Sequence, residues 1–586
     1  MKQVKSITHD MRAFIVPYRS KFIFALIFIF VASIMSVLAP YIEGMITTYL
    51  LAQVSSKSPI VFTHILKIIG ILLVVYVCGS GSRITYQFIL TNAIQAMMKD
   101  LRESIQQKIH RLPVAYFDKH TTGDLMSRMA SDVETLSNAL QQSLAVFVSC
   151  ILMLTFAILA MFIINIKLAL IVVTILPFTL IYGRFIVKRS QPRYQNLQNA
   201  LGDLNGVVQE KYSGYKEIIL FDKQEDAIEE FMEVNQNLCN QSFMSQFVSG
   251  LLTPGINLMT YLIIGIVIYV GGLDVLAQVF LVGQLQAFIR YIWQVADPLN
   301  QMSDLLQILQ AALASLVRIF EVLNADEESE DVVEVQSPTN VKGAVSLEDV
   351  AFGYNATRPL LHDLNVDIKA GQMVAIVGPT GVGKTTLINL LMRFYDIQKG
   401  SIKIDGVDIY KISRDNLRSF FGMVLQDTWL FKGTIKENIA YGVEYASDEE
   451  VINAAKVANA HHFIRTLPEG YQMVINEEGS NISQGEKQLL TIARAILANP
   501  KILILDEATS SVDTRLEMML QDAMTKIMKG RTSFVIAHRL STIKNADIIL
   551  VMRDGNIVEQ GNHEQLLAKK GYYEQLYNAQ FANMKN

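Results

Sequence analysis

Long runs without a charged side chain dominate the first half of the 586-residue chain. Four runs contain no charge and two contain a single arginine: 22–41, 135–166, 168–183 and 234–273, then 68–98 with Arg83 and 275–296 with Arg290. A bilayer core of about 30 Å is crossed by about 20 helical residues, so runs of this length predict membrane-spanning helices. Six spans fit them: about 22–41, 68–90, 143–163, 167–187, 251–271 and 280–299.

The composition agrees with a chain that lies partly outside water. Hydrophobic residues make up 51% and charged residues 18%, whereas about a quarter of a soluble domain is charged. A disordered chain is excluded, because this much apolar surface drives burial. The formal net charge of −4 offers no basic surface, so nucleic acid is not an expected partner.

Basic residues are more numerous in the long connections than in the short ones, and this difference predicts how the chain is oriented in the membrane. The first long connection has six between Lys99 and Arg128, and the second has seven between Arg184 and Lys223. The short connections contain only Lys57, Lys67 and Lys167. Because positive charge resists translocation, we expect a multi-pass protein of the cell membrane whose N-terminus, long connections and C-terminal half are cytoplasmic.

The two long connections read as helices with one polar break each. Residues 91–112 and 193–247 are rich in helix formers and should continue the membrane helices into the cytoplasm. The breaks lie at 117–124 and 212–217. Short crossing helices there could touch a cytoplasmic domain, and plain turns between antiparallel helices are the alternative.

A change of pattern marks the domain boundary. An acidic run at 324–331, followed by Ser337 and Pro338, is typical of a solvated linker. Beyond it, short apolar runs such as 374–377 and 502–505 alternate with helical segments, as in an α/β domain. We therefore expect a six-span α-helical transmembrane domain at 1–323, a linker at 324–341 and an α/β domain at 342–586.

A phosphate-binding loop is the strongest chemical motif. It follows the expected strand 373–377 and opens a helix at Lys384, and its residues are Gly378, Pro379, Thr380, Gly381, Val382, Gly383, Lys384 and Thr385, with Thr386 next in the chain. The glycines let backbone amides face phosphate at a helix N-terminus. Lys384 should reach the β- and γ-phosphates, and the Thr385 hydroxyl should bind magnesium. The motif predicts ATP and Mg²⁺ as cofactors.

A carboxylate pair follows the second buried strand. Asp506 at the end of 502–505 can hold magnesium, and Glu507 beside it can polarise the attacking water. Such a pair alone is as often a helix cap. With the phosphate loop upstream, the catalytic interpretation is favoured.

Further motifs give the chain a family resemblance. Asn481-Ile482-Ser483-Gln484-Gly485-Glu486 is similar to the signature of ATP-binding-cassette (ABC) proteins, and six spans before one cassette resemble a type I ABC exporter half. Asp118 and Gly123-Asp124 fit its first coupling segment. Other matching positions are Tyr354, Gln426, the D-loop residues 510–513 and His538.

The resemblance implies a role for each matching residue. Tyr354 would stack on adenine, Gln426 would touch magnesium and water, and His538 would bind the γ-phosphate. Ser483, Gly485 and Glu486 of the signature would face nucleotide held by the opposite subunit. One cassette therefore cannot complete a site, and a second half-transporter is the implied partner.

Two departures from the usual signature bear on that partner. Gln484 stands where the family has glycine, and Glu486 stands where it has glutamine. The phosphate side, with Glu507 and His538, is intact. This combination resembles the catalytic half of heterodimeric bacterial exporters, whose partner has a degenerate catalytic site. A homodimer that tolerates the changes is the alternative.

The expected function is ATP-hydrolysis-driven export of amphipathic or hydrophobic, drug-like molecules, with membrane lipids around the spans. A lipid or peptide exporter or flippase is the alternative, and a nucleotide-gated channel or sensor is a more distant one. Arg83 and Arg290 lie in apolar runs, where ionisable residues usually face a cavity or a partner. Gln284, Phe288 and Tyr291 share a helix face that could bind cargo or pack against helices.

Overall fold

The computed structural model divides the chain into two units. One comprises 1–111 with 120–325, and the other 112–119 with 326–586. Side chains of 299–300, 302–307, 514, 541, 580 and 581 are not described. The described residues are 11–57, 61–329, 341–355, 358–425, 428–476, 479, 481–506, 514–537 and 540–581.

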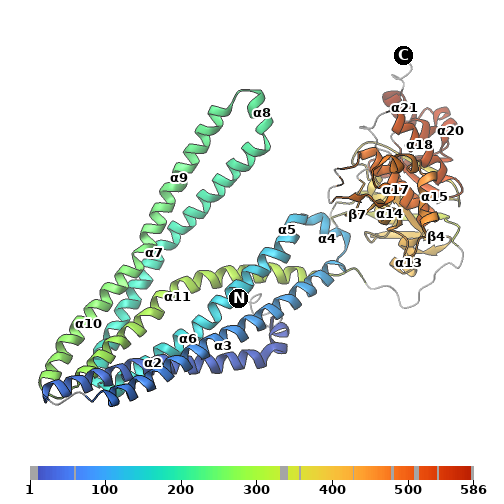
Figure 1. Cartoon of the computed structure of the whole chain (residues 1–586). Coiled ribbons are helices and arrows are strands. Elements are labelled where there is room, and N and C mark those ends of the chain that lie inside the picture. The colour runs from blue at the N-terminus through green and yellow to red at the C-terminus, as the bar shows by residue number, and fades with distance from the viewer. Residues whose placement is uncertain are drawn as a thin grey trace. The chain divides into compact units, whose positions relative to one another are not determined.

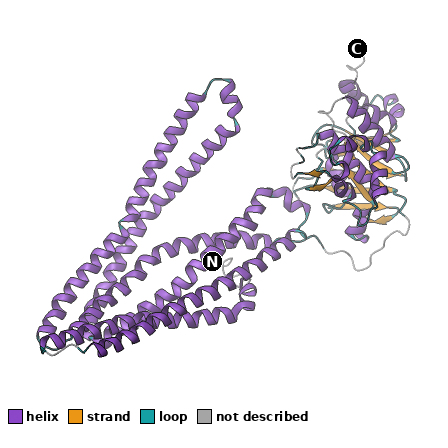
Figure 2. Ribbon diagram, viewed as in Figure 1, coloured by secondary structure: helices purple, strands orange, loops and turns teal. Residues whose placement is uncertain are grey.

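The first unit consists of helices joined by short connections over its described length (Figures 1 and 2). α7 and α9 run side by side as a long hairpin that α8 closes (Figure 1). The helices are η1 (Val16–Tyr18), α2 (Arg19–Ser55), α3 (Phe62–Ile109), α5 (Thr122–Ser127), η2 (Arg128–Asp132), α6 (Val133–Ile164), α7 (Ile166–Ser213), α8 (Tyr215–Leu220), α9 (Gln224–Gly250), α10 (Leu252–Leu276) and α11 (Val282–Leu323).

Five helical segments in the described chain are long and apolar enough to cross a membrane: Met11–Ser55, Phe62–Ile109, Thr122–Ile164, Ile166–Ser213 and Gln224–Leu276. Each contains one of the first five expected spans. The sixth, 280–299, falls at the start of α11, which is not among these segments of the described chain. That span remains a prediction.

The long connections are helical, as expected. α3 continues to Ile109, α7 continues to Ser213, and α9 returns from Gln224. At the breaks lie the short helices α4 (Val114–Lys119) and α5 in the first connection and α8 in the second. The segment 112–119, which contains α4, groups with the second unit rather than with the helices that flank it.

Two aromatic residues on one face of α11 are buried in the core of the first unit. Phe288 is fully buried and Tyr291 is 1% exposed, and both pack into a cluster with residues of α6, α7 and α10. The Tyr291 hydroxyl donates to the carbonyl of Val37 at 2.7 Å. These two side chains therefore serve helix packing and are closed to cargo in this conformation.

At one point of their interface, α2 and α11 approach each other backbone to backbone. A Cβ built at Gly283 would overlap the carbonyl oxygen of Gly44 and the hydroxyl of Thr48, and one at Gly44 would overlap the carbonyl of Gly283. Small residues permit such close helix crossings in membranes. The glycine pair therefore sets how near these two helices lie.

The second unit contains two main sheets. The antiparallel one has the order β2-β1-β4-β5, and the larger has the order β12-β11-β3-β10-β9-β6, with β7-β8 as a small pair. The strands are β1 (Val345–Phe352), β2 (Leu361–Ile368), β3 (Met373–Val377), β4 (Lys399–Ile404), β5 (Val407–Asp408), β6 (Phe421–Val424), β7 (Gly433–Thr434), β8 (Val474–Ile475), β9 (Ile502–Asp506), β10 (Thr532–Ile536), β11 (Ile548–Arg553) and β12 (Asn556–Gly561).

The parallel strands bring the expected phosphate motifs to one edge. β10 pairs in parallel with both β3 and β9, so the ends of β3 and β9 lie on the same side of the sheet, one strand apart.

The α-helices that follow β1 in the second unit are α12 (Lys384–Leu391), α13 (Arg414–Ser419), α14 (Ile435–Ala440), α15 (Asp448–Val457), α16 (His461–Thr466), α17 (Gln484–Ala498), α18 (Thr514–Met528), α19 (Leu540–Asn545), α20 (His563–Ala568) and α21 (Tyr572–Phe581).

Candidate functional site

The phosphate loop joins β3 to α12 through left-handed glycines. Gly381 has φ of +83° and Gly383, the N-cap of α12, has φ of +104°. A side chain at 383 would also lie 2.6 Å from Leu361 Cδ2. Glycine is required there on both grounds, and the resulting turn presents backbone N–H groups ahead of the helix.

Lys384 is held across this loop. Its ammonium donates to the carbonyl of Gly378 at 2.7 Å and to that of Pro379 at 3.0 Å. Burial lowers the pKa of Lys384, and the carboxylate of Asp506 opposes that shift. A half-buried cation beside the loop glycines is well placed to meet a phosphate.

A cavity of about 640 Å³ brings most of the expected nucleotide ligands together. Gly378 and Pro379 instead line an adjoining cavity of about 170 Å³ behind the loop, and Val382 is buried in the core. The larger cavity is lined by Tyr354, Leu360, Thr380, Gly381, Gly383, Lys384, Thr385, Thr386, Asp506 and Ile536.

Tyr354 forms the aromatic wall of this cavity. Its side of the pocket is open, with 48% of the residue exposed, and its hydroxyl lies 3.0 Å from Thr386 Oγ1. Phe352 and Tyr395 both approach its ring nearly edge-on, at 81° and 89°. The packing by Tyr395 was not anticipated from the sequence, because Tyr395 belongs to no motif.

The oxygen donors in the cavity fit a magnesium ion. Thr385 offers a hydroxyl and Asp506 a carboxylate, both from the phosphate edge of the sheet, and Mg²⁺ prefers oxygen ligands shared with substrate phosphates. Within the described ranges, no cluster of three or more His, Cys, Asp or Glu side chains could hold a metal alone. Gln426, Glu507, the D-loop and His538 lie outside the described residues, so their roles remain predictions.

The signature serine begins α17. Ser483 is the N-cap, and its hydroxyl accepts from the backbone N–H of Glu486 at 3.4 Å. The Glu486 carboxylate in turn accepts from the Ser483 N–H at 2.9 Å and its hydroxyl at 2.7 Å. Gly485 is buried. The Glu486 side chain thus turns back onto Ser483 in a reciprocal capping box.

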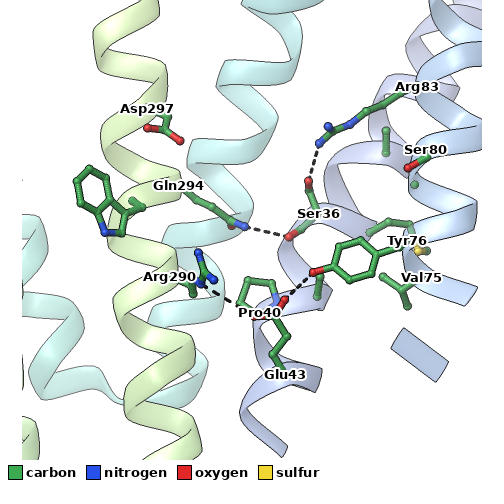
Figure 3. Close-up of a pocket in the computed structure, with 15 residues that line it drawn as sticks. Ser36, Pro40, Glu43, Val75, Tyr76, Ser80, Arg83, Arg290, Gln294 and Asp297 are labelled. Carbon is green, nitrogen blue, oxygen red and sulfur yellow. Dashed lines mark hydrogen bonds and ion pairs between the residues drawn. The ribbon is translucent and has the colours of Figure 1, made fainter. Parts of the chain in front are cut away.

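A second cavity, of about 330 Å³, lies among α2, α3 and α11 in the first unit (Figure 3). Both arginines of the apolar runs line it. Arg83 donates to Ser36 Oγ at 2.8 Å, and Arg290 lies 4.0 Å from a carboxylate oxygen of Glu43. The other lining residues are Ala32, Met35, Ala39, Pro40, Val75, Tyr76, Gly79, Ser80, Trp293, Gln294 and Asp297.

Polar groups of this second cavity, hereafter the transmembrane pocket, bond mainly to α2. The Tyr76 hydroxyl donates to Glu43 at 2.5 Å, and Gln294 donates to the Ser36 carbonyl at 2.9 Å. The Gln294 side-chain oxygen is buried with no hydrogen-bond partner in the described chain. The pocket therefore combines two cations, two acids and an unmatched acceptor within apolar helices.

Comparison with known proteins matches both units to one family. Residues 22–299 match the ABC transporter transmembrane region, and residues 361–510 match the ABC transporter family. The first match contains the transmembrane pocket, and the second contains the phosphate loop and Asp506, whereas Tyr354, Leu360 and Ile536 of the larger cavity lie outside it.

Individual relatives span nearly the whole chain. A fatty acid ABC transporter ATP-binding/permease protein of Mycobacterium bovis is 47% identical over 84% of this chain and 78% of its own length. An ATP-dependent lipid A-core flippase of Desulfotalea psychrophila is 35% identical over 98% and 99%. An uncharacterized ABC transporter ATP-binding protein of Bacillus subtilis is 37% identical over 99% and 95%. The chain therefore belongs to the ABC transporter family, as a multi-pass exporter that fuses its membrane helices to an ATPase domain and couples ATP hydrolysis to transport.

Proposed function

We propose that this exporter moves a long-chain amphiphile with an acidic head group, such as a fatty acid or an anionic lipid. Named relatives support the lipid alternative over the drug-like cargo expected from the sequence, because they are a fatty acid transporter and a lipid A-core flippase. The transmembrane pocket is the observation that carries the proposal.

The arginines of the transmembrane pocket suit an anionic head group. Ionisable residues within apolar helices are costly and usually mark a pathway. No carboxylate within the described chain forms an ion pair with Arg83, whose hydrogen bond goes to the Ser36 hydroxyl. Arg290 has Glu43 only at the 4.0 Å limit. A guanidinium binds a carboxylate or phosphate through two parallel hydrogen bonds, so Arg83 has capacity for such a group.

The same region gives less support to a drug site. Apolar drug-like molecules bind mainly to aromatic and aliphatic walls. Phe288 and Tyr291, the aromatic residues of the α11 face considered for cargo, are buried in helix packing. The transmembrane pocket keeps the aromatic residues Tyr76 and Trp293, but its lining also includes four charged residues: Glu43, Arg83, Arg290 and Asp297.

A matched set of probes tests the proposal. Palmitate and its uncharged methyl ester should be compared as stimulators of ATPase activity in lipid nanodiscs. We expect stimulation by palmitate only, reduced at least about five-fold in Arg83→Gln and Arg290→Gln, since each loses one charge-assisted contact. Arg189→Gln, which alters a cation stacked on Phe185 away from the pocket, is the control. Equal stimulation by the ester would overturn the acidic-head assignment.

ABC exporters function as dimers, and we infer that this one is a heterodimer with unequal ATP sites. The phosphate side of the chain is complete by sequence, whereas the signature that serves the other subunit has Gln484 and Glu486. The Ser483 hydroxyl that would face phosphate is already engaged by a carboxylate. A homodimer would place this signature against both complete sites, and a heterodimer confines it to one.

Nucleotide trapping distinguishes the two assemblies. The chain should be purified alone and with the product of a neighbouring gene, and their ATPase rates compared. We expect the pair to be faster, with one trapped nucleotide for each two cassettes. Full activity of the chain alone with two equivalent sites would establish the homodimer.

A further inference from the structure

Glu43 of α2 lies between residues of two other helices in the transmembrane pocket (Figure 3). One of its carboxylate oxygens accepts a hydrogen bond from the Tyr76 hydroxyl of α3 at 2.5 Å, and the other lies 4.0 Å from Arg290 Nε of α11. The Glu43 side chain is 24% exposed, whereas that of Arg290 is 65% exposed. The carboxylate is therefore largely enclosed, and the guanidinium that it approaches is open to the pocket.

The backbone around Glu43 is held against α11. The next residue, Gly44, meets the backbone of Gly283, and one turn later the Thr47 hydroxyl donates to Gln286 Oε1 at 2.5 Å. A glutamate side chain turns about its own staggered bonds without moving the helix that carries it. The Glu43 carboxylate can therefore move toward Arg290 or away from it while α2 and α11 keep their spacing.

Glu43 and an acidic head group would compete for Arg290. A guanidinium pairs best with one carboxylate through two parallel hydrogen bonds. A second anion beside the first is repelled, and salt screens this repulsion little in a partly buried site. Arg83 instead donates to the neutral hydroxyl of Ser36. Within the described chain, Asp297, the other acid of the pocket, forms no ion pair with either arginine. The competition is therefore confined to Glu43 and Arg290.

We propose that Glu43 is a specificity-determining residue that takes the place of the cargo's head group at Arg290 when the pocket is empty. An arriving acidic head group displaces the carboxylate, which remains bonded to the Tyr76 hydroxyl. When the cargo leaves, Glu43 returns to Arg290 and hinders rebinding. Only head groups that pair with Arg290 more strongly than Glu43 does are then retained. This inference rests on the acidic amphiphile proposed above and adds the residue that limits how tightly it is held.

Trp293 provides a direct measure of binding in this pocket. It is one of the lining residues, and the chain has two tryptophans. The other, Trp429, belongs to the second unit and is 68% exposed. In a Trp429→Phe background, the full chain in liposomes has Trp293 as its single tryptophan. Its fluorescence during titration with palmitate measures binding without ATP turnover.

Removing the competing charge should tighten binding and slow turnover. Glu43→Gln should lower the Kd for palmitate about ten-fold, and slower release should reduce the maximal palmitate-stimulated ATPase rate about three-fold. Tyr76→Phe frees Glu43 to pair with Arg290, so it should raise that Kd about three-fold. Added to Glu43→Gln, the same change should alter the Kd less than about two-fold, because no carboxylate remains to compete. A merely structural role of Glu43 would weaken binding and turnover together.

Asp274→Asn is the matched control. It removes an acid of similar exposure, 23%, that pairs with Lys167 and does not line the pocket, so the Kd should stay unchanged. Unchanged or weaker binding in Glu43→Gln, or an equal gain in Asp297→Asn, overturns the proposal. If palmitate binds and the Glu43 variant shows no gain, the acidic cargo stands and only the competing role is lost. If palmitate neither changes Trp293 fluorescence nor stimulates ATPase in any variant, both assignments fail.

Discussion

Ser483 and Glu486 hold each other at the start of α17. The serine hydroxyl donates to the Glu486 carboxylate at 2.7 Å, and the same oxygen accepts from the Ser483 backbone at 2.9 Å. In the sequence, Glu486 looked like a negative charge placed toward nucleotide. The structure shows that its first effect is on the serine, whose hydroxyl hydrogen cannot serve the carboxylate and a phosphate at once.

Removing that charge should strengthen nucleotide binding at the signature side. Glu486→Gln keeps an oxygen for the capping box and removes repulsion of the triphosphate, so we expect ATP retention there to rise about three- to ten-fold. The loss of a negative charge from the helix start should cost only about 0.3–1 kcal/mol. Trapped nucleotide per dimer measures the effect. Glu450→Gln, in an equivalent capping box on α15, is the control. If this variant raised ATP retention as much as Glu486→Gln does, the gain would come from the smaller net negative charge of the protein and not from the signature.

Lys384→Ala should weaken ATP binding about ten- to a hundred-fold, because it deletes a direct phosphate contact in the 640 Å³ cavity. Equilibrium binding of a fluorescent ATP analogue measures it. Lys399→Ala removes an exposed cation paired with Asp363 and should leave binding unchanged. Unaltered affinity in Lys384→Ala contradicts the phosphate-loop assignment.

Glu507→Gln should separate binding from hydrolysis. The amide has nearly the size of the carboxylate but cannot polarise water in the same way, so steady-state turnover should fall below about a tenth of the wild-type rate. ATP affinity should stay within about two-fold. Phosphate release and nucleotide binding, measured on one preparation, check both parts. A variant that keeps more turnover than this removes Glu507 from the role of base.

Gly283→Ala should destabilise the transmembrane unit. The new Cβ meets the carbonyl of Gly44 and the hydroxyl of Thr48, and overpacking of this kind costs about 1–3 kcal/mol or more. Thermal unfolding in detergent should show a lower midpoint. Gly265→Ala on α10 has open space around its new methyl and should change the midpoint little. Equal midpoints for the two variants would mean that α2 and α11 separate at no cost.

Local pattern was sufficient for much of the fold. The uncharged runs predicted the first five membrane segments, and the motif at 378–385 predicted a turn between β3 and α12, because glycines and a strand-to-helix change are encoded in adjacent residues. Contacts between distant residues were not predictable in this way. Arg83 and Arg290 stood in separate runs, and only the packing of α2, α3 and α11 places them in one pocket.

Side-chain direction was the other missing information. Helical spacing placed Phe288 and Tyr291 on one face, but it did not say that this face would be buried. Likewise, a carboxylate at 486 suggested charge toward nucleotide, and the rotamer turned it toward Ser483. Tyr395 carries no motif, so its contact with Asp118 emerged only from the folded unit.

The contact between Gly44 and Gly283 also affects how the exporter can move. Side chains that interdigitate between two helices must change rotamer before the helices can slide. Where two glycine backbones meet, no side chain lies between the helices, so no such change is needed. A shift of α11 along α2 at this point therefore needs no change of rotamer. A larger movement of α11 must instead break the hydrogen bonds of Tyr291 to Val37 and of Gln294 to Ser36, which join the same two helices farther along.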